Sequence, residues 1–438
     1  MTPIDMDTSP QDGYLVGQKH AWFAFAMTFA LMMFDYIDRQ VIASLFPHIK
    51  AEWHLSDREL GGLVSIISIV VAVGSIPVAL LADRVSRVKS VAVMATIWSL
   101  ATISCMFAGS YAQLFVARAV VGAGEAGYGS VGAALISSLF PKRLRGALLG
   151  AFFGAASVGS VLGVLLGGAI AAKWGWKTAF GVVGVPGLVL ALLYLLVRDY
   201  KTVALTPKLD QVTRSTSGTI KHICSALART RTLLWVCLGG AMQLIVVSAV
   251  WSWMPSYLNR FHGMTPHEAS TQAAIVILVS AVGNVFWGYV VDRMGLRRSR
   301  NKLTSLAVLC VITTLVLVVA FSATQSGAAQ IKLILLGCFF MTCTLGAASG
   351  IVIDVVHPGM RSTGSAVLAL FSNLLGLAIG PILVGVLSDM WNLQQAMQVV
   401  PVFSVVAAVF FIAAARCYDR DVSRVQGIHL DALPAHAT

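Results

Sequence analysis

Charge is what this sequence has least of. Lys, Arg, Asp and Glu together make up 11% of its 438 residues, whereas hydrophobic residues make up 57%. A water-soluble protein of this length could not cover its surface with so few charged side chains. The composition therefore excludes a soluble globular protein and indicates one that lies largely in lipid.

Several chemical signatures are also missing. The sequence has no Gly-rich phosphate loop followed by Lys and Ser or Thr, so we do not expect ATP as the energy source. The seven cysteines show no metal-ligand spacing, and no Ser-His-Asp set stands out. We therefore expect no cofactor, no metal and no enzymatic activity. We also expect no cleavable signal segment, because residues 1–18 are polar and no cleavage site follows the first apolar run.

Long apolar runs fill most of the chain. Each has about 20 residues, which is enough to cross a hydrocarbon core of about 30 Å. They are uniformly apolar, which favours helices over barrel strands that alternate with period two. We expect an all-α membrane protein with twelve transmembrane helices in two pseudo-symmetric six-helix bundles. The expected spans are Trp22–Leu45, Leu60–Leu81, Ser90–Gly109, Ala112–Leu139, Gly146–Ala172, Thr178–Val197, Leu233–Pro255, Ala269–Val291, Leu303–Phe321, Leu333–Asp354, Thr363–Leu387 and Ala396–Ala415.

The two halves of the chain repeat each other. Ser56–Glu59, a pattern typical of a helix start, returns 209 residues later as Thr265–Glu268. Further along, an offset of 217 relates Pro141 to Pro358, Gly159 to Gly376, Gly163 to Gly380 and Trp174 to Trp391. We expect an N-terminal bundle over residues 1–197, a linker over 198–232 with a surface helix near Ile220–Leu227, and a C-terminal bundle with its tail over 233–438. Repeats of this kind are typical of carriers that rock about a central site.

Charge distribution predicts the orientation. The net charge is +12, yet only six of the 31 basic residues fall on one side of the expected spans, Arg39 and Arg118 fall inside spans, and the rest fall on the opposite side. The positive-inside rule then places both termini and the linker in the cytoplasm, in a bacterial-type inner membrane. Topology thus explains the basic balance better than a nucleic-acid partner. The expected partners are a small-molecule substrate, protons and the lipid bilayer, with the chain as a monomer.

Two charged gaps between spans carry the same device. Each has Asp-Arg in register, followed by further basic residues, and is interpreted as a gate that clasps neighbouring helix ends or as plain positive-inside anchoring. An exposed ion pair of this kind contributes about 0–1 kcal/mol, weak enough to break during transport. The gate residues are Asp83, Arg84, Arg87, Asp292, Arg293 and Arg297.

Glycines at four-residue spacing predict close helix contacts. Gly159 and Gly163 lie in one span, and Gly376, Gly380 and Pro381 lie in its repeat. Glycine lets helices approach closely and proline permits a bend, so close packing and a hinge both remain open.

Five ionisable residues lie deep in the spans: Asp35, Asp38, Arg39, Arg118 and Glu125. Each would cost roughly 2.5–3.5 kcal/mol or more facing lipid, so they must face a wet cavity or one another. Burial opposes the charged form of a carboxylate and a nearby arginine favours it, so such a group can exchange a proton near neutral pH. One interpretation is that Asp38 and Glu125 couple transport to protons. Asp35 shares a helix face with Asp38, and Arg39 is then a switchable partner of Asp38 or of substrate. The other interpretation is a static network of buried ions.

The charged gaps resemble the signature loop of the major facilitator superfamily over Asp83–Arg87, and its echo over Asp292–Arg297. Phe34–Gln40 and Arg118–Tyr128 are similar to Spinster-type transporters, and bacterial organic-acid carriers share parts of them. The resemblance implies the twelve-helix carrier fold, a cavity lined by the first and fourth spans, and the same proton-coupling roles at Asp38 and Glu125. It also implies substrate contact or proton transfer at Arg118, which could equally clamp the first span.

The C-terminal half offers neutral groups instead of charges. We expect the substrate to contact Arg39, Arg118 and Tyr128 in the first half and Gln243, Trp251 and Asn373 in the second. The predicted function is a proton-coupled secondary transporter of a small organic acid or aromatic carboxylate, working by alternating access. The alternative is an exporter of lysolipid, sphingoid or other amphipathic compounds. A non-transporting sensor and a channel are further classes that the sequence leaves open.

Overall fold

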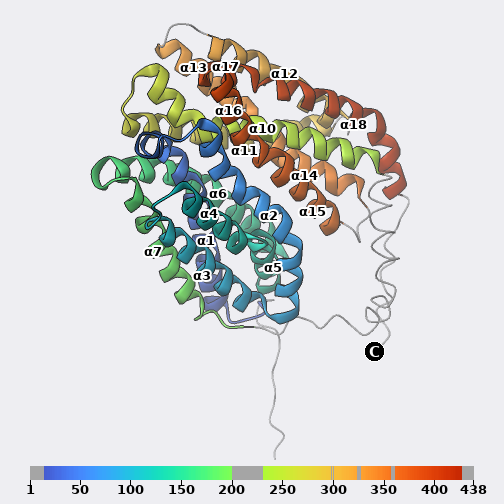
Figure 1. Cartoon of the computed structure of the whole chain (residues 1–438). Coiled ribbons are helices and arrows are strands. Elements are labelled where there is room, and N and C mark those ends of the chain that lie inside the picture. Colours follow the sequence, from blue (N-terminus) through green and yellow to red (C-terminus); the bar gives the residue numbers. More distant parts are fainter. Residues whose placement is uncertain are drawn as a thin grey trace, which may run out of the picture. The chain divides into compact units, whose positions relative to one another are not determined.

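The computed structural model describes residues 14–199, 230–296, 298, 300–322, 327–356 and 361–426. In that part of the chain the secondary structure is helical, as the sequence predicts (Figure 1). The expected surface helix near Ile220–Leu227 lies outside the described residues. The helices are α1 (Gln18–Trp53), α2 (Asp57–Val85), α3 (Arg87–Cys105), α4 (Tyr111–Glu125), α5 (Tyr128–Leu139), α6 (Lys142–Trp174), α7 (Trp176–Tyr194), α10 (Arg231–His262), α11 (Pro266–Gly295), α12 (Asn301–Ser322), α13 (Ala328–Met341), α14 (Thr344–Val355), α15 (Arg361–Phe371), the π-helix η3 (Ser372–Leu377), α16 (Ile379–Met390), α17 (Leu393–Val399) and α18 (Val402–Gln426).

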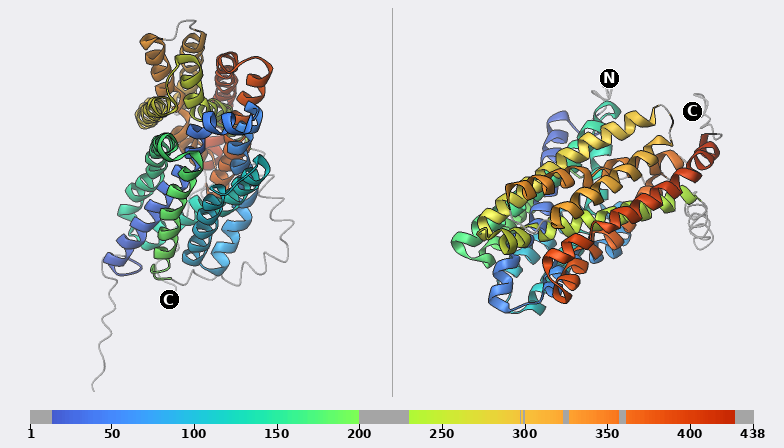
Figure 2. Two further views of the ribbon diagram at one scale, coloured as in Figure 1. Left: turned by 60° about the vertical axis from the view of Figure 1, so that its left-hand side comes forward. Right: turned by 90° about the horizontal axis from the view of Figure 1, so that it is seen from above.

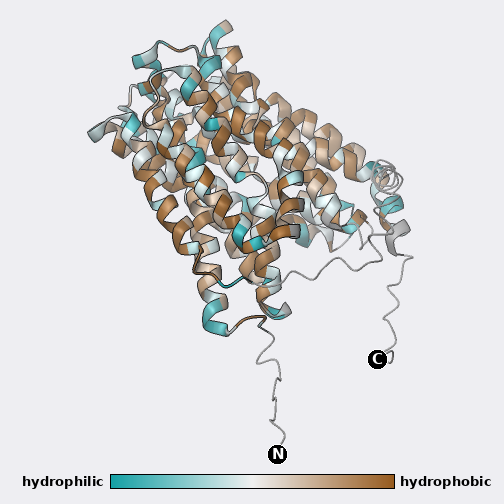
Figure 3. Cartoon of the chain, turned by 60° about the horizontal axis from the view of Figure 1, so that its bottom comes forward, coloured by the Kyte–Doolittle hydropathy of each residue, from teal (hydrophilic) through white to brown (hydrophobic). Residues whose placement is uncertain are grey.

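Twelve segments of the described residues are helical, long enough and apolar enough to cross a membrane, which confirms the twelve expected spans. Several helices run past the predicted ends; α1, for example, continues to Trp53 instead of stopping near Leu45. Hydrophobicity marks only the part of a helix that lies in hydrocarbon, whereas hydrogen bonding continues into the polar headgroup layer. Hydrophobic residues cover most of the helices, and hydrophilic residues gather near helix ends and turns (Figure 3).

The described residues fall into two compact units. The first lies within Met1–Ala204, Ala249–Leu278 and Ala378–Ala396, and the second lies within Leu205–Ser248, Val279–Leu377 and Met397–Thr438. In the first unit α1 packs along α6, and α3 packs between α4 and α7. In the second unit α12 lies beside α13 and α18 (Figure 2). The division at 197 and 233 stays a prediction.

The sequence repeat is also a structural repeat. Helix α2 begins at Asp57 and α11 begins at Pro266, 209 residues later. Both starts carry the same cap: the hydroxyl and the backbone N–H of Ser56 donate to the Glu59 carboxylate, and Thr265 donates to Glu268 in the same two ways. Helices α4 and α13 begin 217 residues apart, at Tyr111 and Ala328.

The fourth and tenth spans are each interrupted at the same point of the repeat. Helix α4 ends at Glu125, and α5 begins at Tyr128 after Gly127, whose φ of 83° lies in the left-handed region that glycine tolerates. Helix α13 ends at Met341 and α14 begins at Thr344. The interruption therefore places Glu125 at a helix end within the membrane region, where a charged side chain needs a partner.

Two glycines of α6 allow close contact with α1. A Cβ atom added at Gly159 would lie 2.3 Å from the carbonyl oxygen of Met33, and one added at Gly163 would lie 2.5 Å from that of Ile37. Backbone atoms cannot move aside as a flexible side chain can. Close packing thus accounts for these glycines, and it holds α6 against the helix that carries Asp35, Asp38 and Arg39.

Substitution of Gly159 tests this packing. Gly159→Ala should lower the melting temperature of the purified protein, because the added methyl overpacks a backbone contact at a cost of about 1–3 kcal/mol. Gly154→Ala, on the same helix but with no neighbour within 4 Å of its would-be Cβ, is the matched control. Because alanine is a better helix former than glycine, the control should be neutral or stabilising. Equal melting temperatures for both variants would contradict the packing argument.

Candidate site for protons and substrate

The five intramembrane charged residues come together in the first unit. Asp35, Asp38 and Arg39 lie within one turn of α1, and Arg118 and Glu125 lie two turns apart on α4. Side chains at i, i+3, i+4 and i+7 share a helix face, so each helix presents its charges on one side. The site is therefore made where these two faces meet.

Asp38 and Arg118 form the most deeply buried pair. Arg118 has no solvent exposure and Asp38 is 2% exposed. The Nη1 atom of Arg118 donates to the Asp38 carboxylate at 3.0 Å and to the Asp38 backbone carbonyl at 3.2 Å. The hydroxyl of Thr102, in α3, donates to the other carboxylate oxygen. Arg118 thus clamps α4 onto α1, which is one of the two roles left open by the sequence.

Arg39 pairs with different carboxylates. Its Nη2 lies 2.9 Å from Oε2 of Glu125, and its Nε lies 3.5 Å from Oδ1 of Asp35. The guanidinium also lies over the ring of Tyr36, 5.5 Å from its centroid. From the sequence we expected Arg39 to be a switchable partner of Asp38 or of substrate. In the structure Arg39 lies against Glu125 and Asp35, and Asp38 lies against Arg118.

Unused hydrogen-bonding capacity remains in this network. Among the residues that the structure describes, Nε and Nη2 of Arg118 and Oε1 of Glu125 have no hydrogen-bond partner, although all three atoms are buried. A guanidinium with two free N–H groups can hold a carboxylate or an ordered water. A free carboxylate oxygen can hold a proton. The geometry is therefore suited to binding both an anion and a proton.

The remaining predicted substrate residues have varied surroundings. Tyr128 is 1% exposed, and its hydroxyl donates to the carbonyl oxygen of Thr28 at 2.6 Å, which ties α5 to α1. Gln243 is buried and donates to the carbonyl oxygen of Met341 at 2.8 Å. Asn373 lies in the π-helix η3 and donates to the carbonyl of Ala369. Trp251 is half-buried on α10. Their contact with substrate stays a prediction.

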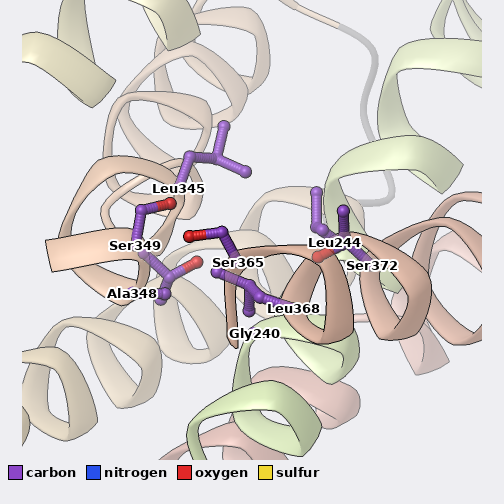
Figure 4. A pocket seen from close by; sticks show the side chains of 10 residues that line it. Gly240, Leu244, Leu345, Ala348, Ser349, Ser365, Leu368 and Ser372 are labelled. Carbon is purple, nitrogen blue, oxygen red and sulfur yellow. The ribbon is translucent and has the colours of Figure 1, made fainter. Parts of the chain in front are cut away.

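The second unit contains a cavity of its own, of about 180 Å³. It lies between α10, α14, α15 and η3, and its lining is free of ionisable groups. The hydroxyl groups of Ser349 and Ser365 point into the same space (Figure 4). An apolar wall with a few hydroxyls is typical of a site for an uncharged part of a small molecule. The lining residues are Gly240, Leu244, Thr344, Leu345, Ala348, Ser349, Ser365, Leu368, Ala369 and Ser372.

The predicted gate residues are only partly described. Asp83 and Arg84 lie in α2, but their side chains, like Arg297, lie outside the described part. Arg87 donates to Ser138 at 3.1 Å, and Arg293 donates to Tyr289 on its own helix.

In the second unit Lys302 bridges two carboxylates near one end of the helices. Its Nζ lies 3.6 Å from Asp292 and 3.2 Å from Asp354. Nothing in the local sequence pattern marks Lys302 as a residue of this cluster. The gate role stays a prediction.

These features define a class. Twelve spans, a twofold internal repeat and a charged site buried within the spans are features of a secondary transporter. The Major Facilitator Superfamily model matches residues 28–378 and again residues 236–428. The chain therefore belongs to the Major Facilitator Superfamily, and it is a transporter, not an enzyme.

Curated relatives and solved structures agree with this assignment. Protein spinster homolog 1 of Xenopus tropicalis is 27% identical over 97% of this chain and 86% of its own. The cis,cis-muconate transport protein of Acinetobacter baylyi is 27% identical over 64% of this chain and 68% of its own. The fold matches the crystal structure of a bacterial homolog of the human lysosomal transporter Spinster, inward-facing and unoccupied, with a TM-score of 0.81, 23% identity, and coverage of 93% of this chain and 99% of that one. The expected resemblance is confirmed.

Removal of one member of the buried pair should destabilise the protein. Asp38→Asn leaves the Arg118 charge without a counterion, so we expect a loss of about 3–5 kcal/mol in the free energy of unfolding. Asp35→Asn is the matched control on the same helix turn, and its effect should be smaller because Arg39 keeps its contact with Glu125. Thermal unfolding in one detergent measures both. A larger loss for Asp35→Asn would contradict this ranking.

Proposed function

We propose that the chain is a proton-coupled carrier of a small organic acid that works by alternating access. The observation that carries the proposal is the buried network of Asp35, Asp38, Arg39, Arg118 and Glu125 in the first unit. A carrier that accumulates its substrate against a gradient must couple that movement to another gradient. This network contains both a proton acceptor and free donors for an anion.

The charge balance of the network supports proton binding. It holds three carboxylates and two guanidinium groups, which leaves one negative charge in excess when all are ionised. Burial of an unbalanced charge costs several kcal/mol, and one bound proton removes the imbalance. When alternating access exposes the network to water, the ionised carboxylate is solvated and the proton can leave. Glu125 is the favoured carrier because its Oε1 has no partner among the described residues.

Arg118 supports an anionic substrate. Two of its guanidinium nitrogens are buried and unpartnered within the described part of the chain, and a planar carboxylate can accept from both. The similarity to a muconate transport protein agrees with an organic acid. We further propose that both termini lie in the cytoplasm, as the distribution of basic residues predicts.

The alternative function is export of lysolipid, sphingoid or other amphipathic compounds, which the nearly full-length similarity to a Spinster homologue favours. A panel of substrates separates this function from transport of an organic acid. Proteoliposomes with an imposed proton gradient would be offered labelled cis,cis-muconate, aromatic acids and lysolipids. We expect accumulation of one of the acids, and a response of that accumulation to collapse of the gradient by an ionophore. Movement of lysolipid alone would favour the amphipathic exporter.

Neutralisation of Glu125 should uncouple transport from protons. With the accumulated acid of the panel, Glu125→Gln should abolish uphill accumulation while retaining exchange of labelled for unlabelled substrate, since exchange needs no net proton movement. Asp38→Asn should also lose accumulation. Glu268→Gln, which neutralises an exposed carboxylate outside the network, is the control and should behave as the parent, because the glutamine oxygen can still accept from Thr265. Full accumulation in both Glu125→Gln and Asp38→Asn would refute the coupling assignment.

A further inference from the structure

A second charged cluster in the first unit joins the start of α2 to the ends of α10 and α16. Asp57 is 2% exposed and lies at its centre. Arg260 binds its carboxylate with two nitrogens, both at 2.7 Å, and Lys50 and Ser388 bind it as well. We call Lys50, Asp57, Arg260, Ser388 and Asp389 the Asp57 latch.

Asp389 completes the latch through the backbone. Its two carboxylate oxygens accept hydrogen bonds from the N–H groups of Asp57 and Arg58, each at 2.8 Å. The first N–H groups of a helix have no partner within that helix, and a negative charge is favourable at this end. A residue more than 300 positions away along the chain therefore caps α2.

The backbones of α2 and α16 also touch below the latch. A Cβ atom added at Gly61 would lie 2.4 Å from the carbonyl oxygen of Pro381, and one added at Gly385 would lie 2.4 Å from that of Asp57. Trp253 of α10 donates to the same Pro381 oxygen at 2.9 Å. The three helices are thus closed against one another at this end.

The repeat provides an internal comparison. Gly385 corresponds to Gly168 of α6, and Asp57 corresponds to Pro266 of α11. Gly168 indeed packs against the start of α11, with its would-be Cβ 2.4 Å from Cβ of Ser270. Yet the positions of Ser388 and Asp389 are taken there by Ala171 and Ala172, and proline has no N–H to donate. The equivalent contact has the close packing without the latch.

We propose that the Asp57 latch is the gate that keeps one face of the transporter shut, and that the equivalent contact of α6 with α11 has no ionic gate. The four charged side chains of the latch sum to zero, so it can open to water without moving net charge. Its bonds are all at the end of the spans, where water can replace them. Two of the six basic residues that depart from the positive-inside pattern, Lys50 and Arg260, are explained as its members.

The inference rests on alternating access as proposed above, but its test needs neither substrate nor protons. Ser65 is 2% exposed and follows Gly61 by one turn on the same face of α2. In a background with the seven cysteines replaced, Ser65→Cys would be labelled with a fluorescent maleimide in lipid nanodiscs, which expose both faces. Labelling should be slow with the latch intact.

Breakage of the latch should speed labelling. Asp389→Asn and Arg260→Gln should each raise the rate roughly tenfold or more, because the first removes the negative charge that caps α2 and the second removes the two-nitrogen contact with the Asp57 carboxylate. Asp57→Asn should also raise the rate. The double variant Asp57→Asn with Arg260→Gln should raise it by less than the product of the Asp57→Asn and Arg260→Gln effects, because both substitutions remove the ion pair between these two residues. Glu59→Gln, which weakens the cap of α2 but touches no latch residue, is the matched control and should stay within about twofold of the parent.

Unchanged labelling in folded Asp389→Asn and Arg260→Gln proteins, judged by size-exclusion profile and melting temperature, would overturn the proposal. So would equal acceleration by Glu59→Gln. If the charge variants do not fold, Ser388→Ala removes a single hydrogen bond of Asp57 and should still increase the rate in the same direction. A normal latch response together with full accumulation in Glu125→Gln would refute proton coupling while leaving the latch in place.

Discussion

The burial of Arg118 against Asp38 is the interaction on which the first unit depends. The guanidinium has no solvent exposure, and its only bonds among the described residues go to the carboxylate and the backbone carbonyl of Asp38. In a lipid environment no water is present to solvate either charge, so separation of the two would cost several kcal/mol. The pair therefore fixes the register of α4 against α1 and with it the position of the other charged groups.

The backbone serves this arrangement in two ways. Close contact at Gly159 and Gly163 holds α6 on the helix that carries the acids. The left-handed turn at Gly127 ends α4 at Glu125, which brings that carboxylate to Arg39 instead of leaving it on a continuous helix. Gly159 and Gly163 thus permit two helices to approach closely, and Gly127 permits a helix to be interrupted.

The two halves share a scaffold but differ in polar content. The positions that correspond to Arg118 and Glu125 at the offset of 217 are Leu335 and Thr342, so the second unit repeats the interruption without the charges. The same contrast holds at the helix ends: a carboxylate of α16 caps the start of α2, whereas alanines stand at the corresponding positions where α6 meets α11. The two copies of the repeat thus keep the same helix arrangement while their polar side chains differ.

The sequence by itself determined the number of spans, the repeat and the identity of the buried charges. Apolar run length sets whether a helix can cross a bilayer, and an acid such as Glu125 stands out in a run because lipid penalises it. Only the tertiary structure decided the pairing, with Arg118 on Asp38 and Arg39 on Glu125. It alone revealed Thr102 and the Asp57 latch, because contacts between residues dozens to hundreds of positions apart leave no local pattern.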